Sequence, residues 1–218
     1  MERKRVSKSD GQKRKSTMNV DVAAKRKRSE VDQSESTGSN TNIHFFYGSR
    51  SPFSNFYNCH FEDEHNNEFF CSEQYFMYHK AILFGDDDMA KKILEEKASP
   101  LKCKKYGRQV TPFDAQIWTK KSFSIMVNGL ILKFGQNDDL REILLSTEDR
   151  LVAEASPRDR RWGIGMGETT AKKTPVDQWP GLNLLGKALM KVRSQLIRQQ
   201  GEKEEQKGKN CGQKVEWE

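Results

Sequence analysis

The chain has 218 residues, a length that suits one ordinary domain with appendages and is short for two full domains. Apolar residues make up only 34% of it and charged residues 32%, so the polar residues must be concentrated in segments that join no core. The formal net charge of +7 would by itself indicate a nucleic-acid binder, but residues 1–42 carry +5 and residues 43–200 only +3.

The N-terminal segment, residues 1–42, holds eleven Lys or Arg, six Asp or Glu and no aromatic residue, which predicts a disordered basic arm. Ten residues separate two basic clusters in it, a spacing typical of a bipartite nuclear localisation signal: Lys13 and Arg14, then Lys25, Arg26, Lys27 and Arg28. We therefore expect a nuclear import receptor as a partner and a nuclear location, with a cytoplasmic fraction left open. The alternative is an arm that contacts the phosphates of RNA or DNA.

Several other classes of protein are excluded. No segment approaches the roughly 18 apolar residues that span a bilayer, and the chain starts without a secretory hydrophobic stretch, so we expect a soluble intracellular protein with no membrane partner. The four cysteines form no Cys-x-x-Cys pair, and the cluster Cys59, His60, His65 and Cys71 lacks the spacing of a zinc finger. The sequence therefore predicts reduced thiols, no metal site and no cofactor.

The core begins with an aromatic segment, residues 43–61, that predicts a strand, a loop and a strand. The polar turn after Phe61 predicts a hairpin that ends at Phe69 and Phe70. Ser72 is a good N-cap for a helix over residues 73–84, which Gly85 would end. A second helix should begin at Asp86–Asp88 and end near Lys97, and a short helical turn should end at Gly107.

The longest periodic stretch, residues 114–134, predicts a central buried helix. A short helix over 137–145 and a last one from Asn183 should follow, with a loop of nearly thirty residues, 155–182, before the last helix. Residues 201–218 contain four Lys and five Glu and predict a disordered charged tail. The fold class is therefore α+β: a mainly helical single domain with a small β-sheet, spanning residues 43–200.

Two groups of residues indicate chemistry. Glu73 and Lys80 lie seven residues apart, on one face of a predicted helix whose other side chains are apolar, so they need partners or a function; a surface ion pair is the alternative. In the long loop and just before it, Glu154, Asp159 and Trp162 precede Gly163. A carboxylate, an indole and a flexible backbone suit a polar ligand with a planar part.

Five short segments resemble, in order, the motifs of the NADAR family, which is associated with NAD and ADP-ribose and includes YbiA-like N-glycosidases. They are Phe53-Ser-Asn-Phe56, Ser72-Glu-Gln-Tyr-Phe76 with Lys80, Lys133-Phe-Gly-Gln-Asn137, Asp159-x-x-Trp-Gly163 and Asn183-x-Leu-Gly186. The resemblance covers residues 43–198. The family's helix motif carries a His directly after the Glu, so Gln74 departs from it, while Glu73 and Lys80 keep their places.

The resemblance implies hydrolysis of the N-glycosidic bond between ribose and a nitrogen base. This reaction passes through an oxocarbenium-like transition state, which needs negative charge near the anomeric carbon and a proton for the departing nitrogen. We expect Glu73 to stabilise the cation, position water or act as nucleophile, and Asp159 to be the proton-transfer partner, with the division of roles left open. Lys80 would bind a phosphate or the sugar and lower the pKa of Glu73.

Further residues are expected to bind the substrate. Arg50 would grip a pyrophosphate, the alternative being a solvated loop arginine. Trp162 and Trp118 would stack on the base, although Trp118 also suits core packing. Asn55 and Asn183 would contact the sugar or base, the alternative for Asn183 being a helix N-cap alone. Glu154 and Gly163 complete the expected set.

The resemblance implies two tasks: removal of ADP-ribose from a modified guanine in nucleic acid, and splitting of phosphoribosylamino-pyrimidine intermediates of riboflavin synthesis. The import signal favours the first task, with ADP-ribosylated guanine in DNA or RNA as the substrate. One alternative is a non-catalytic reader of ADP-ribose or NAD-like ligands, which would need the stacking and phosphate contacts but no pair of carboxylates. Another is a basic adaptor, for which the nearly neutral core offers no basic surface.

Overall fold

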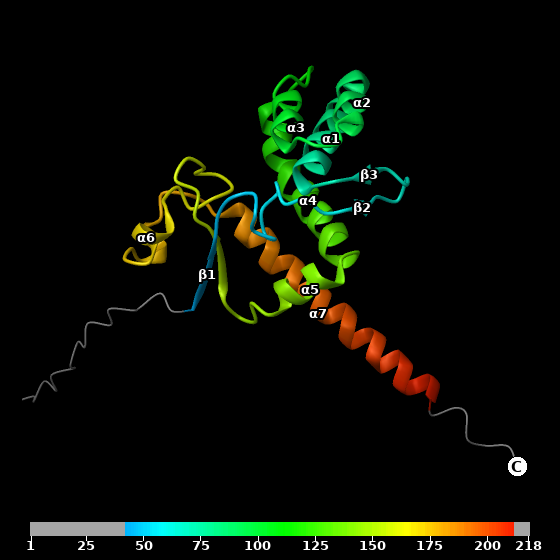
Figure 1. The fold of residues 1–218 in the computed structure, drawn as a ribbon, viewed down its shortest axis with the longest axis vertical. Coiled ribbons are helices and arrows are strands. Elements are labelled where there is room, and N and C mark those ends of the chain that lie inside the picture. Colours follow the sequence, from blue (N-terminus) through cyan, green and yellow to red (C-terminus); the bar gives the residue numbers. More distant parts are fainter. Residues whose placement is uncertain (1–41, 212–218) are drawn as a thin grey trace, which may run out of the picture. The chain divides into compact units, whose positions relative to one another are not determined.

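The computed structural model describes residues 42–211, so the predicted basic arm and its two import clusters lie outside the described residues. In this part of the chain the elements are β1 (Ile43–Phe46), β2 (Phe61–Glu62), β3 (Glu68–Phe69), α1 (Ser72–Phe84), α2 (Asp87–Glu95), α3 (Pro100–Gly107), α4 (Ala115–Gly135), α5 (Asp138–Leu145), β4 (Leu151–Glu154), α6 (Glu168–Ala171), a 3₁₀ turn (Val176–Gln178) and α7 (Leu184–Cys211). The helices dominate, which confirms the predicted α+β fold (Figure 1). No helix among the described residues is both long and apolar enough for a bilayer crossing.

The strands form two small sheets instead of one. β1 pairs in parallel with β4, with Ile43 opposite Leu151 and Phe46 opposite Glu154. The sequence prediction missed β4, because its four residues are too few to show a periodicity. Since the two strands are parallel, their carboxyl ends meet at one edge, and the segments that follow both strands leave from that edge.

The second sheet is the predicted hairpin, in which β2 pairs antiparallel with β3. The Asp63 carboxylate holds the turn by accepting hydrogen bonds from the backbone N–H groups of His65 and Asn67, both at 2.9 Å. Gln136, just after α4, fixes the hairpin to the core through both backbone groups of Glu62, at 2.9 and 2.7 Å. The motif from Lys133 to Asn137, which contains Gln136, therefore has a structural role.

The predicted ends of helices α1 to α5 lie within two residues of the observed ones. α1 begins at Ser72, and Cys71 is its N-cap, one residue before the predicted cap. Gly85 ends α1 with φ of 70°, in the left-handed region that glycine adopts without strain. Asp86, Ser99 and Asp114 cap α2, α3 and α4 with their side chains. α1 packs against α2, α3 and α4, so its side chains are enclosed on several faces.

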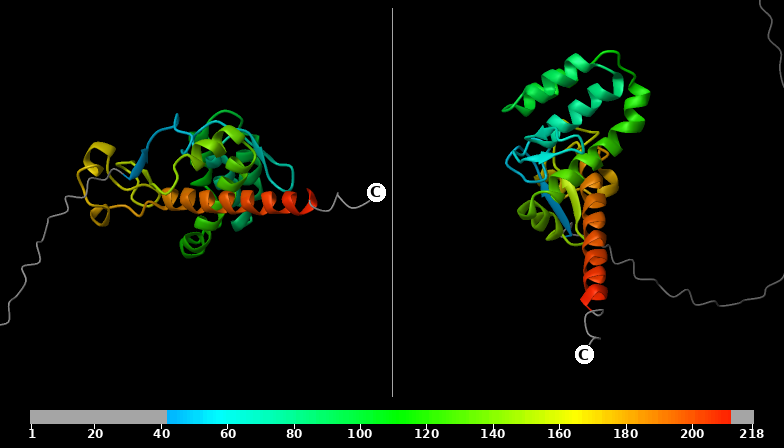
Figure 2. Two further views of the ribbon diagram at one scale, coloured as in Figure 1. Left: turned by 90° about the horizontal axis from the view of Figure 1, so that it is seen from below. Right: turned by 90° about the vertical axis from the view of Figure 1, so that its right-hand side faces the viewer.

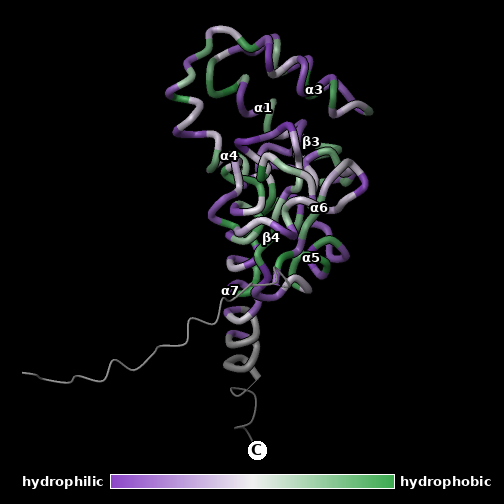
Figure 3. Tube along the Cα trace, turned by 90° about the vertical axis from the view of Figure 1, so that its left-hand side faces the viewer, coloured by the Kyte–Doolittle hydropathy of each residue, from purple (hydrophilic) through white to green (hydrophobic). Residues whose placement is uncertain are grey.

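The last helix, α7, packs against helices and a strand of the domain and is longer than expected. The first part of α7 packs against β4 and α4 through Leu185, Leu189 and Val192, and hydrophobic positions gather where these elements meet (Figure 3). The helix then continues to Cys211 and leaves the other elements behind (Figure 2). The sequence predicts a disordered tail from residue 201; this is wrong for residues 201–211, because residues of good helix propensity and an Arg198–Glu202 pair at i,i+4 favour further turns.

Candidate functional site

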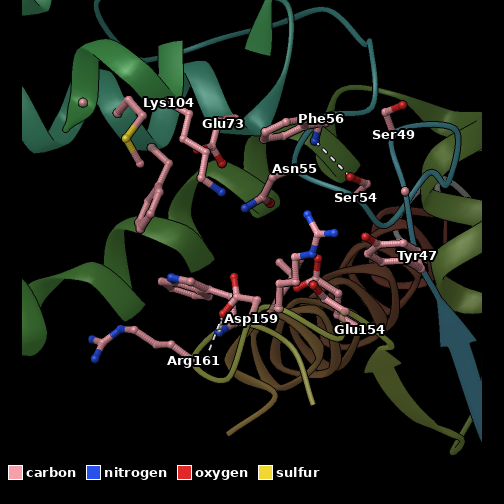
Figure 4. Close-up of a pocket in the computed structure, with 18 of the residues that line it drawn as sticks. Tyr47, Ser49, Ser54, Asn55, Phe56, Glu73, Lys104, Glu154, Asp159 and Arg161 are labelled. Atoms are coloured by element: carbon pink, nitrogen blue, oxygen red, sulfur yellow. Dashed lines mark hydrogen bonds between the residues drawn. The ribbon is translucent and has the colours of Figure 1, made fainter. Parts of the chain in front are cut away.

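A pocket of about 690 Å³ opens at the carboxyl ends of β1 and β4. Its walls are the loop after β1, one face of α1, the end of α3 and the loop after β4. The side chains that α1 contributes are Glu73, Phe76, Met77 and Lys80. In the view of Figure 4, Glu73 and Lys104 lie on one side of the pocket, Asp159 and Glu154 on the other, and Asn55 between them. This volume falls in the usual range for sites that enclose a nucleotide-sized ligand.

Most of the predicted site residues line this pocket, although they come from four separate segments. Seven of them do so: Asn55, Glu73, Lys80, Trp118, Glu154, Asp159 and Trp162. Because parallel pairing brings the segments after β1 and β4 to one edge, the fold joins the aromatic N-terminal loop to the long loop. α1 supplies the facing wall.

Glu73 is almost fully enclosed, with 4% of its surface exposed. Its backbone N–H donates to the carbonyl of Asn55 at 2.9 Å, which fixes the first turn of α1 against the aromatic loop. Burial raises the pKa of Glu73 to about 7, and the Asp159 carboxylate adds to the rise, while the cations Lys104 and Arg108 and a hydrogen bond from the Asn55 side chain oppose it. Glu73 can therefore gain or lose a proton near neutral pH.

Glu154 is the last residue of β4 and is the second carboxyl group with a raised pKa. Burial raises the pKa of Glu154 to about 7, Asp159 and Glu73 add to the rise, and Lys104 opposes it. Its Oε2 atom is buried and has no hydrogen-bond partner among the described residues. This oxygen therefore lacks the polar contacts that normally stabilise a buried carboxylate oxygen.

Asp159 is held differently from the two glutamates. Its Oδ1 accepts hydrogen bonds from the backbone N–H groups of Arg161, at 2.9 Å, and Trp162, at 2.7 Å. Two backbone donors on one oxygen fix the direction of the carboxyl group. Because Trp162 is one of these donors, the same turn also positions the residue that carries the indole.

Lys80 lines the pocket but does not have the predicted electrostatic role. Its Nζ donates to the carbonyl of Gly107 at 2.7 Å and lies 4.1 Å from the centre of the Phe113 ring. Burial lowers the pKa of Lys80. The cations that act on Glu73 are Lys104 and Arg108, so the prediction that Lys80 lowers the pKa of Glu73 is wrong. The hydrogen bond from Lys80 joins α1 to the end of α3, the segment that carries Lys104 and Arg108.

Four cations in the lining were not predicted: Lys104 and Arg108 from the end of α3, and Arg158 and Arg161 from the loop after β4. α3 reads as a short, solvated basic helix, and the loop arginines precede a tryptophan without any phosphate-binding pattern. The sequence does offer one signal for the two arginines, because Arg158 and Arg161 lie next to Asp159 and Trp162, which were already predicted as site residues. With Lys80, five cations and three carboxylates line the pocket, which favours an anionic ligand.

Aromatic side chains form the floor beside the carboxylates. The Phe76 ring lies 5.2 Å from Trp162, edge to face, and 4.9 Å from Trp118. Trp118 packs on the core and also lines the pocket, and its stacking on a base stays a prediction. A planar base entering here would meet indole surface without disturbing the core.

Three predicted substrate contacts lie outside the lining. Arg50 is exposed on the loop after β1. Gly163 is buried under the loop, where an added Cβ would lie 2.9 Å from the Asp159 carbonyl and 3.0 Å from that of Glu154, so glycine is needed for close packing. Asn183 uses its side chain on β4: its Nδ2 donates to the Val152 carbonyl at 2.9 Å, and its Oδ1 accepts from the Glu154 N–H at 3.1 Å.

Neither histidine nor cysteine stands among the described residues that line this pocket. His60, Glu62 and Glu68 bring ligand atoms within 4.8 Å of one another, but they are exposed on the hairpin, away from the carboxylates. Cys71 and Cys103 are buried near Glu73, and burial raises the pKa of each thiol to about 12. Neither thiol therefore has the lowered pKa of a reactive cysteine.

Comparisons with known proteins agree with the geometry. The NADAR domain model matches residues 45–197. N-glycosidase R617 of Acanthamoeba polyphaga mimivirus is 43% identical over 161 residues, covering 69% of this chain and 94% of that protein. Protein irg-1 of Caenorhabditis elegans is 40% identical over 166 residues, covering 69% and 78%. The NMR structure of Escherichia coli YbiA, which is named an N-glycosidase, matches with a TM-score of 0.60 at 27% identity and covers 73% of this chain and 87% of its own.

Proposed function

Because the chain belongs to the NADAR family, and its relatives named N-glycosidases support glycosyl hydrolase activity, we propose that it releases ADP-ribose from a modified guanine base in nucleic acid. The observation that carries this proposal is the meeting of Glu73, Glu154 and Asp159 in one pocket beside an aromatic wall. The ligand is proposed from the chemistry of that lining.

The carboxylates match the needs of N-glycosidic cleavage. As the bond between ribose and nitrogen breaks, positive charge develops on the anomeric carbon and the ring oxygen, and a carboxylate beside them lowers the barrier. The departing nitrogen also needs a proton, which a group with a pKa near 7 can supply or accept. A pocket with one fixed carboxylate, Asp159, and two carboxyl groups of raised pKa provides both kinds of group.

The remaining lining favours ADP-ribose attached to a base. The pyrophosphate is an anion, and the four unpredicted cations lie at the end of α3 and on the loop after β4, two segments that both line the pocket. Guanidinium groups bind phosphate oxygens bidentately, so Arg108, Arg158 and Arg161 are the proposed phosphate contacts in place of Arg50. Trp162 is the proposed stacking surface for a purine ring.

The nucleic-acid part of the proposal rests on the basic arm. A protein directed to the nucleus meets DNA there, whereas an enzyme of riboflavin synthesis has no physical reason to carry an import signal. Deletion of residues 13–28 should move the protein toward the cytoplasm, as followed by fluorescence microscopy of a tagged chain. Unchanged nuclear accumulation would contradict the import role of the two clusters.

The activity itself can be tested with purified full-length protein and an oligonucleotide that carries ADP-ribosylated guanine. We expect release of ADP-ribose and restoration of the unmodified oligonucleotide, both measured by mass spectrometry. Glu73→Ala should lower the rate by about 10²- to 10⁴-fold, and Glu64→Ala, on the exposed hairpin turn, should leave it unchanged. Binding without release by the unmutated protein would favour a reader, and turnover only of a phosphoribosylamino-pyrimidine would favour the riboflavin task.

A further inference from the structure

We infer that Glu154 donates the proton to the departing base, and that Asp159, which the sequence assigns to proton transfer, instead supplies the fixed negative charge beside the ribosyl cation. This inference rests on the proposed N-glycosidase function and divides the work among its three carboxyl groups. It follows from how each carboxyl group is held: Asp159 by two backbone donors, Glu73 by cations and an amide, and Glu154 with an oxygen left unpaired.

The backbone of Glu154 is fixed from both sides. Its N–H donates to the Asn183 side chain at 3.1 Å, and its carbonyl accepts from the N–H groups of Ser156, at 2.8 Å, and Ile164, at 2.9 Å. Parallel pairing with Phe46 holds the same residue within the sheet. The carboxyl group therefore projects into the pocket from a rigid strand end, which is the kind of support that a positioned acid needs.

The surroundings of the carboxyl group favour its protonated form. Its Oε2 is buried without a partner, so ionisation would leave an unpaired buried charge. The charged groups that face it are Asp159 from its own loop, Glu73 from α1 and Lys104 from α3, two carboxylates against one cation. The pKa of Glu154 is accordingly raised to about 7, so the group is protonated in a large fraction of molecules near neutral pH and can still give up that proton.

The other two carboxyl groups suit other roles. Asp159 accepts two backbone hydrogen bonds on Oδ1, and these hold its carboxyl group in one orientation. Glu73 also has a raised pKa, but two cations and the Asn55 side chain favour its ionised form, whereas only one cation acts on Glu154. Because Glu73 raises the pKa of Glu154, Glu154 holds its proton more readily once Glu73 is ionised.

The reaction balances with water as the co-reactant. The electron pair of the N-glycosidic bond leaves with the base nitrogen, and the Glu154 carboxyl transfers its proton to that nitrogen. The ribosyl cation, stabilised by the Asp159 carboxylate, is attacked by a water oxygen. The Glu73 carboxylate accepts a proton from that water, and the proton returns to Glu154 or to solvent. The products are free ADP-ribose with an anomeric hydroxyl group and the neutral base.

The test uses the full chain, two substrates and three variants. The substrates are an oligonucleotide with ADP-ribosylated guanine and the same oligonucleotide with that guanine also methylated at N7, which makes it a better leaving group that needs less proton donation. Glu154→Gln should lower kcat on the first substrate by about 10²- to 10⁴-fold with little change in KM. It should lower kcat on the methylated substrate by about 10-fold or less, because proton donation contributes less to that reaction. The alkaline limb of the kcat/KM profile should also disappear.

Two further variants separate chemistry from folding. Glu154→Asp, which keeps an acid at the same strand end, should recover part of the lost rate, and Glu64→Gln, on the exposed turn, should behave as the unmutated protein. Thermal unfolding followed by circular dichroism shows whether Glu154→Gln is folded. Equal losses on both substrates in a folded Glu154→Gln protein, or an unchanged rate, would overturn the inference. Failure of the unmutated protein to cleave either substrate would instead refute the proposed function.

Discussion

Replacing Glu73 with glutamine should stabilise the protein above neutral pH while it removes activity. An acid whose pKa is higher in the folded than in the unfolded chain contributes stability below its unfolded pKa, and this contribution is lost as the pH rises through its folded value. For Glu73 the rise is from 4.5 to about 7, caused first by burial. At 1.36 kcal/mol per pKa unit, ionising Glu73 costs the folded state about 3 kcal/mol by pH 8.

Glutamine has nearly the same shape and no charge to bury, so Glu73→Gln avoids this cost. Urea unfolding of both proteins, followed by circular dichroism at pH 4 and pH 8, gives the difference in free energy of unfolding at each pH. We expect this difference to move in favour of Glu73→Gln by about 3 kcal/mol between the two values. Comparing the two pH values cancels every contribution of the substitution that does not depend on pH.

The control for that experiment is Glu64→Gln, whose parent side chain is 87% exposed on the hairpin turn and should show no such pH dependence. Because Glu73 also raises the pKa of Glu154, its replacement lowers the cost of ionising Glu154 as well. This second contribution also favours the stability of Glu73→Gln at the higher pH. A difference between Glu73→Gln and the unmutated protein that stays constant from pH 4 to pH 8 would refute the view that Glu73 is a buried acid with a raised pKa.

Three further substitutions test the framework of the site. Gly186→Ala should cost about 3 kcal/mol of stability, measured by urea unfolding, because its Cβ would collide with a β4 carbonyl, whereas Gly201→Ala, in open space, should cost far less. Gln74→Leu should cost about 3 kcal/mol in the same assay, since its amide bonds four backbone groups around α1 and α2. Lys104→Met should move the pKa of Glu73 upward, seen as a shift of the kcat/KM profile to higher pH, and Lys105→Met should not.

The local parts of this fold could be predicted from the sequence because each depends on a few neighbouring residues. Capping residues such as Asp114 and the glycine after Phe84 mark helix ends by their own hydrogen bonds and backbone preference. The same holds for the Glu73 helix, whose apolar neighbours on nearly every side indicated burial. β4 was missed because a four-residue strand has no pattern of its own and is defined by pairing with a segment more than a hundred residues away.

Site residues could be predicted where the residue type and its neighbours in the sequence indicate a chemical role. Residues whose role depends on contacts that only the folded chain creates were missed. Glu73, Asp159 and Trp162 were identified in advance, and they line one pocket. Asn183 looked like a ligand contact or a helix cap, but its side chain completes the edge of β4, a role that depends on an unpredicted strand. Lys104 looked like one charge among many on a solvated helix until packing of α3 placed it beside Glu73.

The most direct test of the account is the fate of the oxygen in the product. The unmutated protein is incubated in H₂¹⁸O with an oligonucleotide that carries ADP-ribosylated guanine, and the products are analysed by mass spectrometry. Hydrolysis of the N-glycosidic bond in this pocket predicts free ADP-ribose that contains one ¹⁸O atom and an oligonucleotide restored to its unmodified mass, with neither formed by Glu73→Ala. An unchanged oligonucleotide that remains bound to the protein, or release of a product without ¹⁸O, would contradict it.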